Sequence, residues 1–455
     1  MATQKPKYPV SDPALVIAAC KPNEPLPPGD ERYYDFAPIR HTDTQLKLRN
    51  SFSSLSAKDE FCHRILTGHK GSGKSTELLQ FQQWANDNGY CAVWIPIILE
   101  LGLIDLEFSD LYLAAIAALE RELNERGCAA PTKALKEFRG WFVERVREHT
   151  KARTSELGAE ASAKVKTGIP FIGSLLAKFF ASVRSASREA VTIRETIRRF
   201  PVSLIDLANQ VFREACKCLQ KKNGSFRGLI LIFDDIDKFD PDVVDHVLVQ
   251  SVTQIRSMQC HGLLTMPIEL EYSPRSSPIR DAFGPPLILP MIPIRARDRE
   301  WGERVSESEF DEPAVNEMIQ SLNRRIVAKE IFDKPEDVNL LVRMSGGCMR
   351  ELLHLVNESW TCRRQAATID SEAVLEGIRT VRSTYVRQLS VTDYKLLARV
   401  ARDKAMPGEI EKPERLLLHR YVLEYDTSTW VDVHPLIVDI PEFQREYRAL
   451  HKVTP

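Results

Sequence analysis

The sequence CHRILTGHKGSGKSTELLQF, residues 62–81, decides the fold, because a short apolar run, a glycine-rich loop and a helical pattern follow one another directly. Residues 68–75 fit the pattern G-x-x-x-x-G-K-[S/T]. Glycines let the backbone curl so that successive N–H groups point at one anion. A helix that starts at the end of such a loop adds its own N–H groups and the positive end of its dipole. The stretch therefore predicts a loop that grips phosphate groups.

Each part of the predicted loop has a distinct expected role. Lys74 is expected to reach the β- and γ-phosphates of a nucleoside triphosphate, and the Ser75 hydroxyl is expected to bind Mg²⁺. The flanking strand and helix are the context that this motif requires, which argues against a simple glycine turn. The residues predicted to hold the phosphates are Gly68, His69, Lys70, Gly71, Ser72, Gly73, Lys74, Ser75 and Thr76.

Apolar runs at intervals along the chain predict a parallel sheet. Continuous apolar strands of this kind are typical of sheets that are covered by helices on both faces. Helical patterns separate the runs, and this alternation indicates an α/β fold. The expected strands are residues 62–67, 90–98, 227–233, 261–270 and 286–292.

Acidic residues follow the third expected strand, in LILIFDDIDKFD at residues 229–240. In phosphate-transferring sites, one such carboxylate orients Mg²⁺ and another acts as the base on the attacking water. We assign Asp234 to the metal and Asp235 to the water, with Asp237 as the alternative base. The competing interpretation is that these acids only cap the following helix.

Four consecutive segments describe the expected domain organisation. Residues 1–50 are rich in Pro and charge and predict an N-terminal arm. Residues 51–300 form the expected phosphate-loop core, with a helical insertion at about 109–222. Residues 301–385 predict a helical lid that is interrupted at Ser345-Gly346-Gly347. Residues 386–455 read as helix, helix and two short strands, RYVLEY and TWVDVHPLI, which is the outline of a winged helix.

Composition limits the classes of function that the chain can have. The formal net charge is -1, so the whole molecule is no polycation, and only a local patch could bind nucleic acid. Such a patch is residues 133–199, with 15 Lys and Arg against 7 Asp and Glu; the alternative is that these are solvated helix faces. The apolar run 168–183 is shorter than the roughly 20 residues that a spanning helix needs, so no transmembrane segment is expected. An N-terminus without an apolar signal region and an odd set of nine Cys favour unpaired thiols and a cytoplasmic protein.

GHKGSGKSTEL followed by LILIFDDIDKFD resembles the P-loop ATPases of the AAA+ and STAND (signal-transducing) classes. The DDIDK segment is similar to both KAP-type and origin-recognition ATPases, and the resemblance covers about residues 30–440. It implies ATP with Mg²⁺ as the ligand. It also implies further site residues: Thr265 as a sensor near the γ-phosphate, Arg350 reaching that phosphate from the lid, Arg280 (or, less well placed, Arg275) as an arginine finger for a neighbouring subunit, and Tyr33 with Tyr34 near adenine.

Three functions remain open on this basis. The leading one is a regulatory ATPase whose nucleotide state drives a conformational or assembly switch, through self-association or a partner protein, and relatives in bacterial defence and signalling fit it. The alternative is a DNA-binding or DNA-remodelling ATPase, which the winged-helix outline and the basic segment 133–199 favour. The third is an interaction scaffold with an inactive site, against which the intact Lys74, Ser75 and Asp234 argue.

Overall fold

The computed structural model describes residues 7–40, 42–53, 61–102, 105–128, 132–149, 172–296, 309–364, 367–408, 414–426 and 429–451. It divides into two compact units. Unit 1 comprises Met1–Thr44, Gly68–Thr76 and Ile288–Pro455, and unit 2 comprises Gln45–Thr67 and Glu77–Leu287. Both units are discontinuous in sequence, whereas the four expected domains are consecutive segments.

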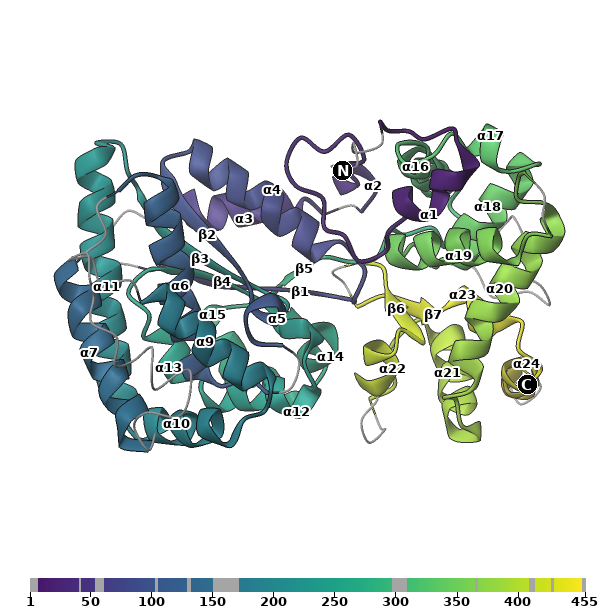
Figure 1. Cartoon of the computed structure of the whole chain (residues 1–455). Coiled ribbons are helices and arrows are strands. Elements are labelled where there is room, and N and C mark those ends of the chain that lie inside the picture. Colours follow the sequence, from purple (N-terminus) through teal and green to yellow (C-terminus); the bar gives the residue numbers. More distant parts are fainter. Residues whose placement is uncertain are drawn as a thin grey trace. The chain divides into compact units, whose positions relative to one another are not determined.

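A five-stranded sheet in the order β2-β3-β4-β1-β5 forms the α/β core (Figure 1). Strand β3 pairs in parallel with β2 and with β4. Strand β1 runs in the same direction as β4, because Gly262 N–H donates to Cys62 O and Thr67 Oγ1 donates to Met266 O, both at 2.9 Å. The carboxyl ends of β1, β3 and β4 therefore meet at one edge of the sheet. The strands are β1 (His63–Gly68), β2 (Tyr90–Pro96), β3 (Gly228–Asp234), β4 (His261–Pro267) and β5 (Leu287–Ile288).

Both faces of the sheet are buried, which explains why its strands are continuously apolar. Leu229, Leu231 and Phe233 of β3 belong to the large core that includes the helical insertion. Ile230 and Ile232 alternate with them and are also fully buried. Successive side chains of a strand point to opposite faces, so an apolar residue is needed at every position.

Three of the expected strands of the sheet, 90–98, 261–270 and 286–292, are longer than the observed ones, and each contains a proline at or near the point where the observed strand ends. Strands β2 and β4 end at Pro96 and Pro267, and the next residues begin α5 (Ile97–Leu101) and α14 (Ile268–Glu271). The strand predicted at 286–292 is reduced to β5, because Pro290 and Pro293 have no N–H to offer a neighbouring strand.

Helices make up the described part of the insertion, as the sequence predicts for 109–222. The apolar run 168–183 falls partly outside the described residues, and the remainder lies in α9, whose Leu175, Leu176, Phe179 and Phe180 are buried. No helix within the described ranges is both long enough and apolar enough to cross a membrane. Part of the basic segment 133–199 also lies outside the described residues. The helices are α6 (Phe108–Glu125), α7 (Thr132–His149), α9 (Gly173–Arg184), α10 (Arg188–Arg198) and α11 (Pro201–Lys222).

The remaining elements of unit 2 lie before β2 and between β3 and β5. Phe52 of α3 and Phe81 of α4 pack ring against ring, with centroids 5.2 Å apart. These elements are α3 (Thr44–Ser53), α4 (Lys74–Asp87), the 3₁₀ turn η2 (Ile236–Lys238), α12 (Pro241–Val244), the π-helical turn η3 (Asp245–Gln250), α13 (Val252–Arg256), η4 (Pro274–Ser276) and α15 (Ser277–Phe283); Thr44, and Lys74 to Thr76, fall in unit 1.

Unit 1 combines the N-terminal arm with the lid helices and the C-terminal hairpin. Val10 pairs with the main chain on either side of Ile326, so the arm is anchored on the lid helices. The lid helices are interrupted at 345–348, close to the predicted break. The elements are η1 (Pro13–Leu15), α1 (Val16–Ala19), α2 (Ala37–Arg40), α16 (Glu312–Asn323), α17 (Ala328–Ile331), α18 (Pro335–Met344), α19 (Met349–Cys362) and α20 (Ser371–Val386).

The C-terminal segment contains helix, helix and an antiparallel hairpin in the predicted order. Strands β6 (Val422–Glu424) and β7 (Val431–Val433) pair with each other. The second strand is shorter than the predicted 429–437, because Pro435 begins a helix that His434 caps by accepting the Leu436 N–H at 3.2 Å. The helices are α21 (Val391–Asp403), α22 (Glu414–Leu418), α23 (Pro435–Val438) and α24 (Pro441–His451).

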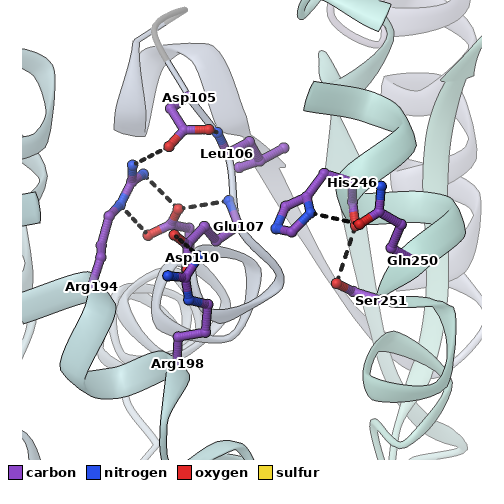
Figure 2. A network of polar contacts seen from close by, with 9 residues as sticks. All are labelled: Asp105, Leu106, Glu107, Asp110, Arg194, Arg198, His246, Gln250 and Ser251. Atoms are coloured by element: carbon purple, nitrogen blue, oxygen red, sulfur yellow. Dashed lines mark hydrogen bonds and ion pairs between the residues drawn. The ribbon is translucent and has the colours of Figure 1, made fainter. Parts of the chain in front are cut away.

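A buried ion pair fastens α10 to the start of α6 (Figure 2). The Arg194 guanidinium donates to both carboxylate oxygens of Asp110, at 2.5 and 3.2 Å. Asp110 is fully buried and also accepts the Glu107 N–H at 2.9 Å, which closes a capping box at the helix start. Arg194 reaches Asp105 as well, at 3.3 Å. The ion pair thus joins two helices of the insertion, α6 and α10. Each buried charge is compensated by the other, so the loss of one residue leaves the other without its partner.

Replacing Arg194 by Leu is expected to lower the free energy of unfolding of unit 2 by about 3 kcal/mol, because it leaves the Asp110 carboxylate buried without its cation. Arg198→Leu is the matched control, one turn along α10. Its contact with Glu107 is 3.9 Å long and its side chain is 53% exposed, so the loss should stay below about 1 kcal/mol. Chemical denaturation followed by circular dichroism measures both. Equal losses in the two variants would show that burial does not set the strength of the Arg194 pair.

Candidate functional site

The phosphate loop of unit 1 has the backbone that its glycines permit. Gly68, Gly71 and Gly73 all have positive φ angles, of 153°, 98° and 104°. At Gly71 space is decisive as well, because a Cβ there would lie 2.8 Å from Cys348 Sγ and 2.9 Å from Arg350 Cβ. The start of α19 therefore approaches the loop more closely than any side chain at position 71 would allow.

Lys74 begins α4 and folds over the first residues of the loop. Its ammonium donates to the carbonyls of Gly68 at 2.7 Å and His69 at 2.9 Å, and the side chain is buried. Ser75 follows in the first helical turn. The ammonium therefore lies over the start of the loop and the N-terminus of α4 lies at its end. A helix N-terminus at the end of such a loop is an arrangement that binds phosphate.

Three contacts from outside the motif hold the loop within unit 1. His69 Nε2 accepts the Glu424 N–H of β6 at 2.8 Å. The Arg40 guanidinium donates to Ser72 O at 2.6 Å, and Thr76 Oγ1 accepts the Leu26 N–H at 3.1 Å. Sequence reasoning missed Arg40 and Glu424, and no spacing or motif marks either of them.

The His69 imidazole is neutral in this setting. Burial lowers its pKa to about 3, and the nearby positive charges of Lys74 and Arg420 act in the same direction. Since Nε2 accepts a hydrogen bond, the ring proton is on Nδ1. His69 is therefore a fixed acceptor over the whole physiological pH range.

Arg350, predicted to act from the lid, is the second residue of α19 and lies beside Gly71. Together with Lys70, His354 and Arg420 it lines an open cavity of about 530 Å³ within unit 1. Burial lowers the pKa of His354. The carboxylates of Glu351 and Glu358 line the same cavity, and Glu351 pairs with Arg420 at 3.1 Å. The predicted contact between Arg350 and a γ-phosphate stays a prediction.

The two tyrosines predicted to lie near adenine are placed differently within the arm. Tyr34 donates to the Glu317 carboxylate of α16, and the Arg324 guanidinium lies 5.4 Å from its ring centroid. Tyr33 is half-buried, and its N–H donates to Asp30 O at 3.0 Å. A role of either residue in base binding stays a prediction.

The acidic residues of unit 2 lie at the carboxyl end of β3. Asp234 is 1% exposed; its carboxylate accepts the Asp235 N–H at 2.8 Å and the Trp94 indole N–H at 3.3 Å. Asp235 has a φ of 73°, which is unusual for a residue other than glycine, and it forms an ion pair with Lys238. Strained backbone of this kind clusters at functional sites. Asp237, the alternative base, is buried in the same turn.

Thr265 of β4 is fully buried and supports this turn. Its hydroxyl accepts the Ile236 N–H at 3.0 Å and lies 3.5 Å from Phe233 O. It thereby fixes the backbone on both sides of the two acidic residues. The predicted role as a γ-phosphate sensor stays a prediction.

Both candidate arginine fingers lie in ion pairs within unit 2. Arg280 of α15 pairs with Glu271 at 3.1 Å and has a side chain that is 46% exposed. Arg275 pairs with Asp245 at 3.1 Å. Action of Arg280 on a neighbouring subunit stays a prediction, and the absence of any larger species in solution with a non-hydrolysable ATP analogue would contradict it.

The oxygen donors present suit magnesium. Mg²⁺ prefers hard oxygen ligands and is commonly held by one or two protein groups together with substrate phosphates. The Ser75 hydroxyl and the buried Asp234 carboxylate are groups of this kind.

No protein-family model matches the chain, and no curated protein matches it in sequence. Among solved structures, it is similar to a Walker-type ATPase of Pyrococcus abyssi, with 14% identity, a TM-score of 0.37, and 94% of this chain and 99% of that chain covered. It is also similar to Cdc6p from Pyrobaculum aerophilum, with 11% identity, a TM-score of 0.36, and 95% and 98% covered. A third similar structure is the Aeropyrum pernix Orc1 protein in complex with DNA, with 14% identity, a TM-score of 0.33, and 95% and 97% covered.

Proposed function

We propose that the chain binds ATP with Mg²⁺ in the loop Gly68 to Ser75 and hydrolyses it. The observation that carries the proposal is the loop itself: three positive-φ glycines, the Lys74 ammonium above them and the N-terminus of α4 at its end. Backbone N–H groups and a helix N-terminus bind phosphate without any further device.

The residues have separate roles in this proposal. Lys74 and the loop amides hold and orient the phosphates, and Asp235 accepts a proton from the attacking water. Ser75 and Asp234 would hold Mg²⁺, which would neutralise part of the charge of the phosphates. Arg350 and Arg280 would contact the γ-phosphate from the lid and from a second subunit. The nucleotide state would then bias a conformational or assembly switch, which makes the chain a regulatory ATPase of the AAA+ and STAND type.

Release of phosphate from ATP by the purified chain tests the proposal. Turnover is expected with Mg²⁺ and is expected to stop when EDTA removes the metal, because the triphosphate then loses its charge-neutralising ion. GTP in place of ATP serves as the comparison for base preference. Negligible turnover under all conditions, with ATP still bound, would leave a binding switch in place of an enzyme.

A DNA-binding ATPase is the second candidate. The observation that favours it is the order of α21, α22 and the β6–β7 hairpin, which matches the outline of a winged helix. Binding carried by phosphate contacts should weaken steeply as salt rises. A titration of duplex DNA at two ionic strengths, with and without ATP, measures this. No binding at low salt would exclude the candidate.

A further inference from the structure

We infer that His69 is a positioning residue, and that through it the C-terminal hairpin sets the geometry of the phosphate loop. The inference rests on the proposed ATP site and adds a means of regulating it. His69 occupies a variable position of the motif, so the motif alone gives it no role beyond its backbone.

The side chain and the carbonyl of His69 connect two different structures. The side chain is 1% exposed, and its Nε2 accepts the Glu424 N–H of β6 at 2.8 Å. The carbonyl accepts the Lys74 ammonium at 2.9 Å and the Ser72 N–H at 3.1 Å. A displacement of His69 therefore moves an anchor of the lysine that is proposed to grip ATP.

The hairpin side of this connection is also held firmly. The carbonyl of Glu424 accepts the Met291 N–H at 2.9 Å, so the residue whose N–H reaches His69 also binds the segment after β5 through its C=O. That segment lies against the loop, because a Cβ on Gly68 would come within 2.4 Å of Leu289 O. Leu423, which precedes Glu424 in β6, packs in a small buried cluster with Met291 and Cys348.

Cys348 provides a second link between this cluster and the loop. Its thiol lies 3.7 Å from Gly71 O, a distance consistent with a weak S–H···O hydrogen bond. Because Gly71 and His69 both contact the hairpin or its cluster, the loop cannot change shape without disturbing them. Coupling between two sites is reciprocal in binding free energy. ATP at the loop must therefore alter the stability of the hairpin to the extent that the hairpin alters the affinity for ATP.

Two substitutions at position 69 distinguish the effect of losing the hydrogen-bond acceptor from the effect of changing the side-chain volume. Gln places its Oε1 where the imidazole has Nε2, whereas Leu fills the space without an acceptor. His69→Leu leaves the buried Glu424 N–H unsatisfied and is expected to weaken binding of radiolabelled ATP with Mg²⁺ about tenfold, and His69→Gln less than about threefold. Equal affinities for ATP in wild type and His69→Leu would overturn the inference.

Hydrogen exchange without nucleotide makes the test independent of ATP binding. The amides of residues 420–426 should exchange faster in His69→Leu than in wild type or His69→Gln. His261→Leu is the matched control, because His261 is likewise buried and accepts one backbone N–H, from Cys62 at 3.0 Å in unit 2. It should leave residues 420–426 unchanged. If wild type fails to bind ATP while this exchange pattern holds, the proposed function is lost and the connection through His69 stands.

A substitution in the hairpin tests the same connection in a protein that keeps His69, so the test does not depend on a His69 variant that folds poorly. Leu423→Ala loosens the buried cluster without touching the loop motif. It is expected to weaken ATP binding in the wild-type background and to have a smaller effect in the His69→Leu background, because interacting residues are not additive. Additive effects in the double variant would show that the hairpin does not act through His69.

Discussion

Replacing Lys74 by Ala should lower the affinity for ATP by about 1,000-fold, because each hydrogen bond to a charged group contributes about 1.5–3 kcal/mol and the ammonium is expected to serve two phosphates. The structure adds a second cause. The ammonium donates to the carbonyls of Gly68 and His69, and the variant would lose both of these hydrogen bonds, although the His69 carbonyl keeps the Ser72 N–H as a donor. Equilibrium binding of a fluorescent ATP analogue, confirmed by competition with ATP, measures the effect.

The matched control for Lys74 is another lysine of the same loop. Lys70 lines the cavity beside Arg350, and its role in the motif belongs to its backbone N–H. Lys70→Ala keeps that backbone and removes the same charge, so it is expected to weaken ATP binding no more than about 100-fold, as the loss of a single charge-assisted contact would. Unchanged affinity in Lys74→Ala would mean that the nucleotide binds elsewhere on the chain.

Asp235→Asn should reduce ATP turnover by about 10²–10⁴-fold, which is the usual contribution of a positioned general base. The amide keeps the size of the carboxylate but cannot accept the proton from water. Because the residue is assigned to the chemical step, kcat should fall while KM changes little. Steady-state kinetics with Mg²⁺ and ATP gives both constants.

Asp237→Asn distinguishes the two possible bases. Asp237 lies in the same buried turn, so its substitution disturbs the surroundings of the site in a similar way. Turnover that falls in Asp237→Asn and persists in Asp235→Asn would transfer the role to Asp237. Loss of the ion pair with Lys238 accompanies the change at Asp235, and Lys238→Met shows how much of the effect that pair accounts for.

The α/β core was predictable because its signals are local. Apolar runs identify β1 to β4 to within a few residues, and the glycine pattern of residues 68–75 explains the positive φ angles of the loop. The errors are also local in origin: Pro96, Pro267 and Pro290 end strands that hydropathy alone would extend.

The supports of the site were not predictable from the same signals. Trp94 binds Asp234 from a strand 140 residues away, Arg40 binds Ser72 from the arm, and His69 binds Glu424 across 355 residues. None of these pairs has a spacing that repeats along the sequence. Two of the three contacts also involve a main-chain group, which every residue type carries, so the residue type at that position gives no signal.

The sequence by itself determined the prediction of which residues bind phosphate, metal and water, because that chemistry depends on residue type and short spacing. Only the tertiary structure decided that the loop lies in the same unit as the arm, the lid helices and the C-terminal hairpin. The physical reason is that a turn or a strand end is fixed by neighbours in the chain. The contacts that hold the turn or strand end in place depend instead on how the whole unit packs.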